Sequence, residues 1–204
     1  MYVALSMDDA RQCSVLELDR PNDCVEKDRV SLFDGQSYEE RCDREWWVLY
    51  TKSRQEKALS QYLKSRGTPH YLPLHKKYSL LRGRRVSSQV PLFSGYVFLF
   101  GDRDERIVAL ESNRIARSIH VPETWQDPFW RDLSQIQCLI DSGLPMTPES
   151  RIQAGQRVRV RSGRLAGLEG IVTKRRNGTR LLVAVDYLQQ GASIEIDDFV
   201  LEVV

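Results

Sequence analysis

Hydrophobic and polar residues alternate with a period of two over the last fifty or so residues. Val158 and Val160 face one side of a predicted strand. Arg157, Arg159 and Arg161 face the other side. This alternation recurs between turn signals such as Asn177-Gly178, a strong hairpin signal. We therefore predict a small barrel of five strands, at 157–161, 169–175, 180–186, 193–196 and 200–203.

Between residues 46 and 141 the pattern changes between strand and helix periods. It predicts strands at 46–51, 70–78, 84–92, 96–100 and near 115–121. Ser53-x-x-Glu56 fits a capping box for a first helix, which Gly67 ends. A second helix is predicted at 104–111. Alternation of strands and helices indicates an α/β sandwich, with helices packed on a mixed sheet.

A third helix is predicted to open at Asp127-Pro128, where proline fits the first helical turn. Its expected apolar face consists of Trp130, Leu133, Ile136 and Ile140. The proline-containing segment that follows predicts a linker at 144–152. We thus expect an α+β chain with an extension (1–44), an α/β domain (45–143), this linker and a barrel domain (153–204).

Charge is distributed unevenly along the 204 residues, although the net charge is only +2. Residues 1–45 contain six Lys or Arg and twelve Asp or Glu, whereas the remainder contains 24 and 16. The acidic extension is expected to be largely disordered, because its apolar patches are too short to build a core. The basic body could contact nucleic acid, and a solvated surface explains the same charge.

Several function classes lack support in the sequence. Cysteines 13, 24, 42 and 138 form no Cys-x-x-Cys pair, which favours reduced cytoplasmic thiols. The three histidines have no partner at metal-ligand spacing, and no phosphate loop or nucleophile elbow is present. No segment has the ~20 apolar residues that span a bilayer. We expect no enzyme, cofactor, metal or membrane contact, and a cytoplasmic protein.

Aromatic residues are concentrated on and beside two predicted strands, at Tyr50, Phe93, Tyr96 and Phe98. Alternation places Phe93 with Val97 on one face, and Tyr96 with Phe98 on the other. Ordinary core packing would explain any one of these residues. Their number exceeds what one helical layer needs to cover the sheet, so a binding surface is the alternative.

Two motifs in order resemble the NusG family of transcription factors. Residues 45–63, which begin Glu-Trp-Trp-Val-Leu-Tyr, and residues 91–100 resemble its amino-terminal NGN domain. Gly155, Gly163, Ala166-Gly167 and Gly170 have the spacing of the KOW motif found in NusG-type factors and some ribosomal proteins. The resemblance implies an NGN domain followed by an SH3-like KOW barrel.

This resemblance implies a factor that promotes transcription elongation or antitermination. It also implies a monomer that is associated with the nucleoid. It implies that Tyr50, Phe93, Tyr96 and Phe98 receive the β′ clamp helices of RNA polymerase. Basic residues are expected near the non-template DNA of the transcription bubble, or near polymerase and upstream DNA. These residues are Lys52, Arg54 and Lys57, with Arg82, Arg84 and Arg85 at a hairpin tip. Solvated loops are the simpler explanation of both groups.

The loop Tyr187, Leu188, Gln189 and Gln190 matches the position where family members contact Rho or a small-subunit ribosomal protein. Housekeeping members usually have Phe-Gly-Arg there, and Asn-Thr-Pro-Gly-Val where this chain has Ser-Asn-Arg-Ile-Ala at residues 112–116. These departures favour a specialised RfaH-like paralogue. The alternative is an RNA- or ribosome-binding KOW protein. The resemblance leaves open whether the barrel inhibits the NGN domain, although the Val/Ile alternation favours a stable barrel.

Overall fold

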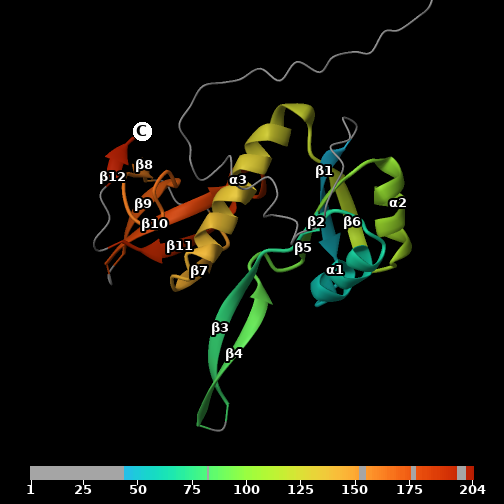
Figure 1. Cartoon of the computed structure of the whole chain (residues 1–204), viewed down its shortest axis with the longest axis horizontal. Helices are drawn as coiled ribbons and strands as arrows, with labels where there is room; N and C mark the ends of the chain where they lie inside the picture. The colour runs from blue at the N-terminus through green and yellow to red at the C-terminus, as the bar shows by residue number, and fades with distance from the viewer. Residues whose placement is uncertain (1–43, 82, 152–154, 176–177, 197–200) are drawn as a thin grey trace, which may run out of the picture.

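The computed structural model describes residues 44–81, 83–151, 155–175, 178–196 and 201–204. Among them, helix α3 (Glu123–Asp141) lies between two β-sheets, and a long hairpin projects from the first sheet (Figure 1). Of the predicted extension, only Arg44 is described, and its guanidinium Nη2 lies 2.7 Å from Oε1 of Glu105. The predicted site residue Arg82 and turn residue Asn177 lie outside the described residues.

The first sheet has the strand order β2 (His70–Tyr71), β5 (Tyr96–Gly101), β1 (Glu45–Thr51) and β6 (Ile115–His120). All its neighbouring strands are antiparallel, so the predicted mixed sheet is wrong. The reason is topological. β1 and β2 run in the same direction, but β5 is inserted between them and pairs antiparallel with both.

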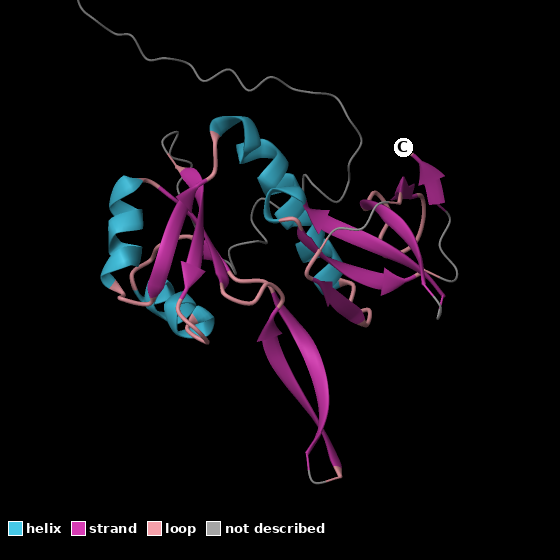
Figure 2. Ribbon diagram, turned by 180° about the vertical axis from the view of Figure 1, so that it is seen from behind, coloured by secondary structure: helices cyan, strands magenta, loops and turns pink. Residues whose placement is uncertain are grey.

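Helices cover both faces of this sheet, which confirms a layered α/β arrangement (Figure 2). α1 (Glu56–Ser65) and α2 (Arg103–Glu111) cover the face formed by Leu49, Val97 and Leu99. α3 covers the face formed by Trp46, Val48 and Phe98. Strand alternation explains this division, because successive side chains of β1 and β5 point to opposite helical layers.

The first two helices begin differently from the prediction. α1 starts at Glu56 with Gln55 as N-cap and no side-chain cap, so the predicted Ser53 capping box is wrong. A capping box instead starts α2, where Asp102 accepts from the N–H of Glu105 and the Glu105 side chain accepts from the N–H of Asp102. Gly67 follows α1 at φ +66°, as predicted for a helix terminus.

α3 starts at Glu123, four residues before the predicted Asp127-Pro128 start. Pro128 lies inside the helix, although proline removes one helical hydrogen bond. Gln126 offsets this loss by tying the first turn to the sheet. Its Nε2 donates to the Val121 carbonyl at 2.6 Å, and its Oε1 accepts from the Trp46 N–H at 2.7 Å.

α3 is buried on a wider surface than the predicted single stripe. Leu133 and Ile136 are fully buried as expected, whereas Trp130 and Ile140 are only partly buried. Phe129 and Leu139 are also fully buried. The helix needs this wider apolar surface because it contacts both sheets.

The hairpin consists of β3 (Leu74–Leu81) and β4 (Arg84–Pro91), which pair only with each other. The single strand predicted at 70–78 is therefore two strands, separated at Leu72 and Pro73. Gly83 at the tip has φ +77°, a conformation that glycine adopts readily. The hairpin extends well beyond both helical layers (Figures 1 and 2).

The second sheet contains the five predicted C-terminal strands and one more. Its order is β12 (Leu201–Val203), β8 (Gln156–Val160), β9 (Glu169–Arg175), β10 (Gly178–Val185), β11 (Gln190–Glu195) and β7 (Met146–Glu149). β7 falls in the predicted linker and pairs with β11, a strand that the sequence pattern did not predict. Among the described residues the outer strands β12 and β7 are not paired, so the pairing does not close a barrel.

Candidate functional site

The four predicted aromatic residues lie together at the end of the first sheet. Tyr50 and Tyr96 are direct partners in the β1–β5 register, and their ring centroids are 5.4 Å apart. The rings of Phe93 and Phe98 are 6.0 Å apart. Tyr50 is 45% exposed and Tyr96 half-buried, whereas Phe93 and Phe98 are at most 1% exposed. The two tyrosines, which we call the tyrosine pair, are therefore the accessible part of the cluster.

Phe93 does not lie where strand alternation placed it. β5 starts only at Tyr96, and Gly95 has φ +85°, so a turn separates Phe93 from the strand. The Tyr96 N–H donates to the Phe93 carbonyl at 3.2 Å. This turn brings Phe93 against Phe98, rather than onto the opposite face with Val97.

The same turn is held rigidly beside the tyrosine pair. Oε1 of the buried Glu56 accepts from the Gly95 N–H at 2.7 Å, and the Gly95 carbonyl accepts from the Thr51 N–H at 2.8 Å. A Cβ at position 95 would lie 3.1 Å from Cε2 of Tyr50. Glycine is thus required both by the backbone conformation and by the close approach of the Tyr50 ring.

The first predicted basic group lies next to the tyrosine pair. Lys52, Arg54 and Lys57 are all exposed, at the end of β1 and the start of α1. Lys52 Nζ donates to the Asn113 carbonyl at 2.7 Å. Lys57 Nζ donates to the Gln89 carbonyl at 2.5 Å. These acceptors are neutral, so the hydrogen bonds position the two ammonium groups without neutralising them.

The hairpin group is only partly described. Arg84 and Arg85 are exposed on β4, and the Arg85 guanidinium carbon lies 4.5 Å from the ring centroid of Tyr78. The bond from Lys57 to Gln89 joins the two basic groups, because Gln89 belongs to the base of the hairpin. The sequence pattern did not connect these two groups, and it did not single out Tyr78. An aromatic residue close to several lysines and arginines was the feature that could have identified it.

The predicted C-terminal partner loop packs against α3. The Tyr187 ring is 5.7 Å from Phe129 and 5.9 Å from Trp125, centroid to centroid. Leu188 also packs against the core. Gln189 is exposed with φ +55°, and Gln190 begins β11. Tyr187 and Leu188 therefore face α3 in this arrangement, which sequence reasoning did not anticipate.

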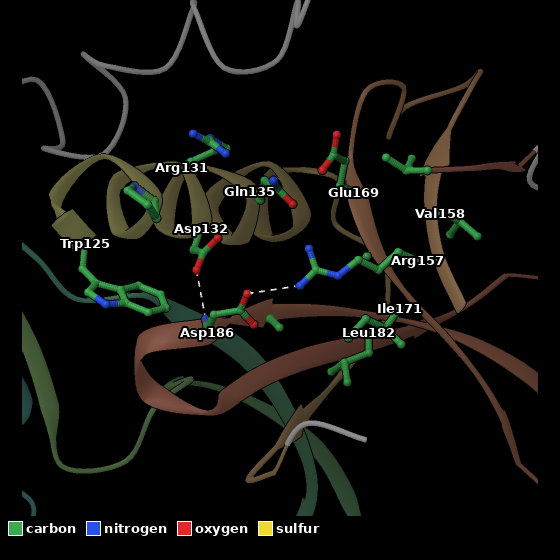
Figure 3. A pocket seen from close by; sticks show the side chains of 14 residues that line it. Trp125, Arg131, Asp132, Gln135, Arg157, Val158, Glu169, Ile171, Leu182 and Asp186 are labelled. Atoms are coloured by element: carbon green, nitrogen blue, oxygen red, sulfur yellow. Dashed lines mark hydrogen bonds and ion pairs between the residues drawn. The ribbon is translucent and has the colours of Figure 1, made fainter. Parts of the chain in front are cut away.

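A cavity of about 160 Å³ lies between α3 and the second sheet (Figure 3). Asp132 of α3 points toward the Asp186 backbone, with its Oδ2 2.9 Å from the Asp186 nitrogen. The Asp186 carboxylate points toward Arg157, whose Nη2 lies 3.4 Å from its Oδ2. Burial and the nearby Asp186 charge raise the pKa of Asp132 to about 6, against the opposing effect of the Asp186 N–H.

The cavity lies where α3 meets the second sheet. No sequence motif predicts it, because Asp132 and Asp186 are 54 positions apart. Among the described residues, no group of three or more His, Cys, Asp or Glu side chains could hold a metal ion. No helix within the described ranges is long and apolar enough to cross a membrane.

Residues 44–129 match the family model described as transcription termination factor NusG. None of the curated proteins compared with the chain matches it. A solved structure that matches is the crystal structure of the MjSpt4:Spt5 complex in conformation A. It is 14% identical, covers 78% of this chain and 98% of the other, and superposes with a TM-score of 0.25.

The family match includes β1 to β6, α1, α2 and the start of α3, and thus the tyrosine pair and both basic groups. It ends before the second sheet. Residues 44–129 are therefore similar to the NusG family of transcription factors.

Proposed function

We propose that this protein is a NusG-type transcription elongation factor that binds RNA polymerase through the tyrosine pair. The observation that carries the proposal is an exposed aromatic pair on a braced turn, within the segment that matches the NusG family. Transcription is the function of the matched family, and the proposed contact gives this chain a specific surface for it.

The tyrosine pair suits the apolar tip of a helical hairpin. Aromatic side chains supply large contact areas, and a rigid support reduces the entropy lost on binding. Phe93 and Phe98 form the buried support below the pair, and α3 fixes that support through the Phe98–Phe129 contact at 5.5 Å. We propose the β′ clamp helices as the partner.

Lys52, Arg54 and Lys57 form the nucleic-acid contact in this proposal. They border the tyrosine pair, so a factor docked on the clamp would present them to the non-template strand of the bubble. With three phosphate contacts, the logarithm of the binding constant would fall with the logarithm of salt concentration at a slope of roughly two. Each phosphate of a single strand contributes about 0.7 to this slope. Such a contact supplements polymerase binding and promotes elongation by shifting the clamp population toward its closed state.

We further propose that the second sheet is a KOW-type domain of a specialised RfaH-like paralogue, with Rho or a small-subunit ribosomal protein as partner. Its loop at Leu188–Gln190 offers no cation to a partner. Because Tyr187 packs on Phe129 and Trp125, recruitment through this ring requires release from α3. Polymerase binding and partner recruitment would then use different surfaces of the chain.

The test is retention of core RNA polymerase, without nucleic acid, by the immobilised full-length chain. We expect Tyr50→Ala/Tyr96→Ala to lose retention while the circular dichroism spectrum stays unchanged. Tyr78→Ala is the matched control, because it removes another exposed tyrosine, far out on the hairpin. Equal retention by wild type and the double variant would contradict the proposed contact. Absence of retention together with binding to ribosomes would support the RNA- or ribosome-binding alternative.

A further inference from the structure

The hairpin β3–β4 belongs to a long stretch without negative charge. No Asp or Glu occurs between Lys57 and Gly101, although the chain contains 28 such residues. The stretch contains eight cationic residues, which are Lys57, Lys64, Arg66, Lys76, Lys77, Arg82, Arg84 and Arg85. An exposed hairpin of this composition is complementary to a polyanion.

The pairing register divides the hairpin side chains between two faces. Tyr78 pairs with Ser87, and Leu80 pairs with Arg85, so these side chains share one face. We call this the Tyr78 face, and its members are Lys76, Tyr78, Leu80, Arg85, Ser87 and Gln89. The opposite face contains Lys77, Ser79, Arg84, Val86 and Ser88. Each face therefore has one lysine of β3 and one arginine of β4.

Among the described hairpin residues, Tyr78 has the one exposed aromatic ring, since the His75 ring on the opposite face is buried. Tyr78 is 56% exposed and Leu80 is 78% exposed. Neighbouring large apolar side chains that are this exposed are typical of an interaction surface. The Arg85 guanidinium covers one side of the Tyr78 ring at 4.5 Å. This cation–π contact orients the ring and puts a phosphate-binding group directly beside it.

The Tyr78 face continues toward the body of the protein. Gln89 lies near the hairpin base, and its carbonyl accepts from Lys57 Nζ. Cations thus occur near the tip with Arg85, and at the base with Lys76, which pairs with Gln89, and with Lys57. The strand rise of about 3.3 Å per residue gives roughly 13 Å between positions 76 and 80, enough for a short extended strand.

We propose that the Tyr78 face binds single-stranded nucleic acid, with one base stacked on Tyr78 and the backbone following Arg85, Lys76 and Lys57. A single strand fits because its bases are free to stack on an aromatic ring, whereas duplex bases are already stacked on each other. A protein partner would need an acidic groove to match the same five-cation hairpin. The inference rests on the nucleic-acid contact of the proposed function.

The experiment measures binding of a fluorescently labelled oligothymidylate to the full-length chain at low salt, by anisotropy and without polymerase. We expect Tyr78→Ala to raise Kd by roughly five-fold or more, the loss of one base–aromatic stack. Tyr78→Phe retains the ring and should stay within about two-fold of wild type. The exposure of Tyr78 makes unfolding of these variants easy to exclude by circular dichroism.

The two faces provide a matched charge control. Lys76→Ala/Arg85→Ala should weaken binding more, and reduce the salt dependence more, than Lys77→Ala/Arg84→Ala. Equal weakening by both pairs, or no effect of Tyr78→Ala, would overturn the proposal and leave only diffuse attraction. Loss of core polymerase retention in Tyr78→Ala with unchanged oligonucleotide binding would make the hairpin a protein contact and also overturn it. Because the oligonucleotide assay contains no polymerase, the stacking inference and the polymerase contact can fail separately.

Discussion

The Tyr187 ring packs against Phe129 with centroids 5.7 Å apart, and Phe129 in turn packs against Phe98 at 5.5 Å. These contacts connect a loop of the second sheet, through α3, to the buried support of the tyrosine pair. The C-terminal loop and the proposed polymerase-binding surface therefore share one aromatic core.

Tyr187→Ala should loosen the second sheet from α3. An aromatic pair contributes about 0.5–1.5 kcal/mol beyond its buried area, and Tyr187 contacts both Phe129 and Trp125. We expect a lower melting temperature and faster proteolytic cleavage between α3 and the second sheet. Gln189→Ala is the control, because Gln189 is exposed in the same loop. Identical cleavage rates in both variants would contradict a stabilising role for this contact.

Asp132 makes the stability of the α3 contact depend on pH. Its folded pKa of about 6 lies above the ordinary 3.8, so the folded protein binds this proton more tightly than the unfolded chain. Protonation therefore stabilises the fold, and this contribution is lost as pH rises from about 4 to about 6. Since Asp132 is not fully buried, we expect a contribution on the order of 1–2 kcal/mol.

The test for Asp132 is chemical denaturation of wild type and Asp132→Asn between pH 4 and pH 7. Asparagine retains an oxygen acceptor for the Asp186 N–H and removes the charge. The variant should gain free energy of unfolding relative to wild type as pH rises, with the difference reaching a plateau above pH 6. A difference that is constant over the whole range would exclude the raised pKa of this carboxyl.

Glu56 should be important for the turn that supports the tyrosine pair. Glu56→Ala removes the acceptor of the Gly95 N–H, and an unsatisfied buried donor costs about 1–3 kcal/mol. Glu56→Gln retains an oxygen acceptor, so its free energy of unfolding is expected to fall less than that of Glu56→Ala. Equilibrium urea denaturation gives the free energy of unfolding, and core polymerase retention reports on the surface. Equal losses for alanine and glutamine would show that the hydrogen bond to Gly95 is not the cause.

The two candidate caps give opposite expectations. Asp102→Ala removes the capping box of α2 and should cost about 1 kcal/mol in the free energy of unfolding. Ser53→Ala should have little effect, since the serine side chain does not cap α1. Thermal denaturation of both variants measures the difference. A larger loss for Ser53→Ala would contradict the observed start of α1.

The spacing of hydrophobic, polar and glycine residues was enough to predict most local elements. The alternation of Val158 and Val160 with arginines, and the positions of Gly67 and Gly83, predicted strands and ends that the structure contains. The sequence pattern also pointed to the aromatic cluster and to the basic residues. It did not point to Tyr78. These features depend on neighbours within a few positions, whose spacing fixes which side chains share a face. Pattern alone placed Phe93 on the wrong face, because it did not show the turn at Gly95.

The accessibility of these elements, by contrast, depends on how the helices and sheets pack together. Phe98 is buried because α3 packs over it, and Tyr187 faces that same helix although 58 positions separate it from Phe129. The first turns of α3 are bonded to β1 through Gln126 and Trp46, which are 80 positions apart. The Lys57–Gln89 bond likewise joins two basic groups that are distant in sequence. Such contacts depend on how complete surfaces fit together, and no local periodicity encodes that fit.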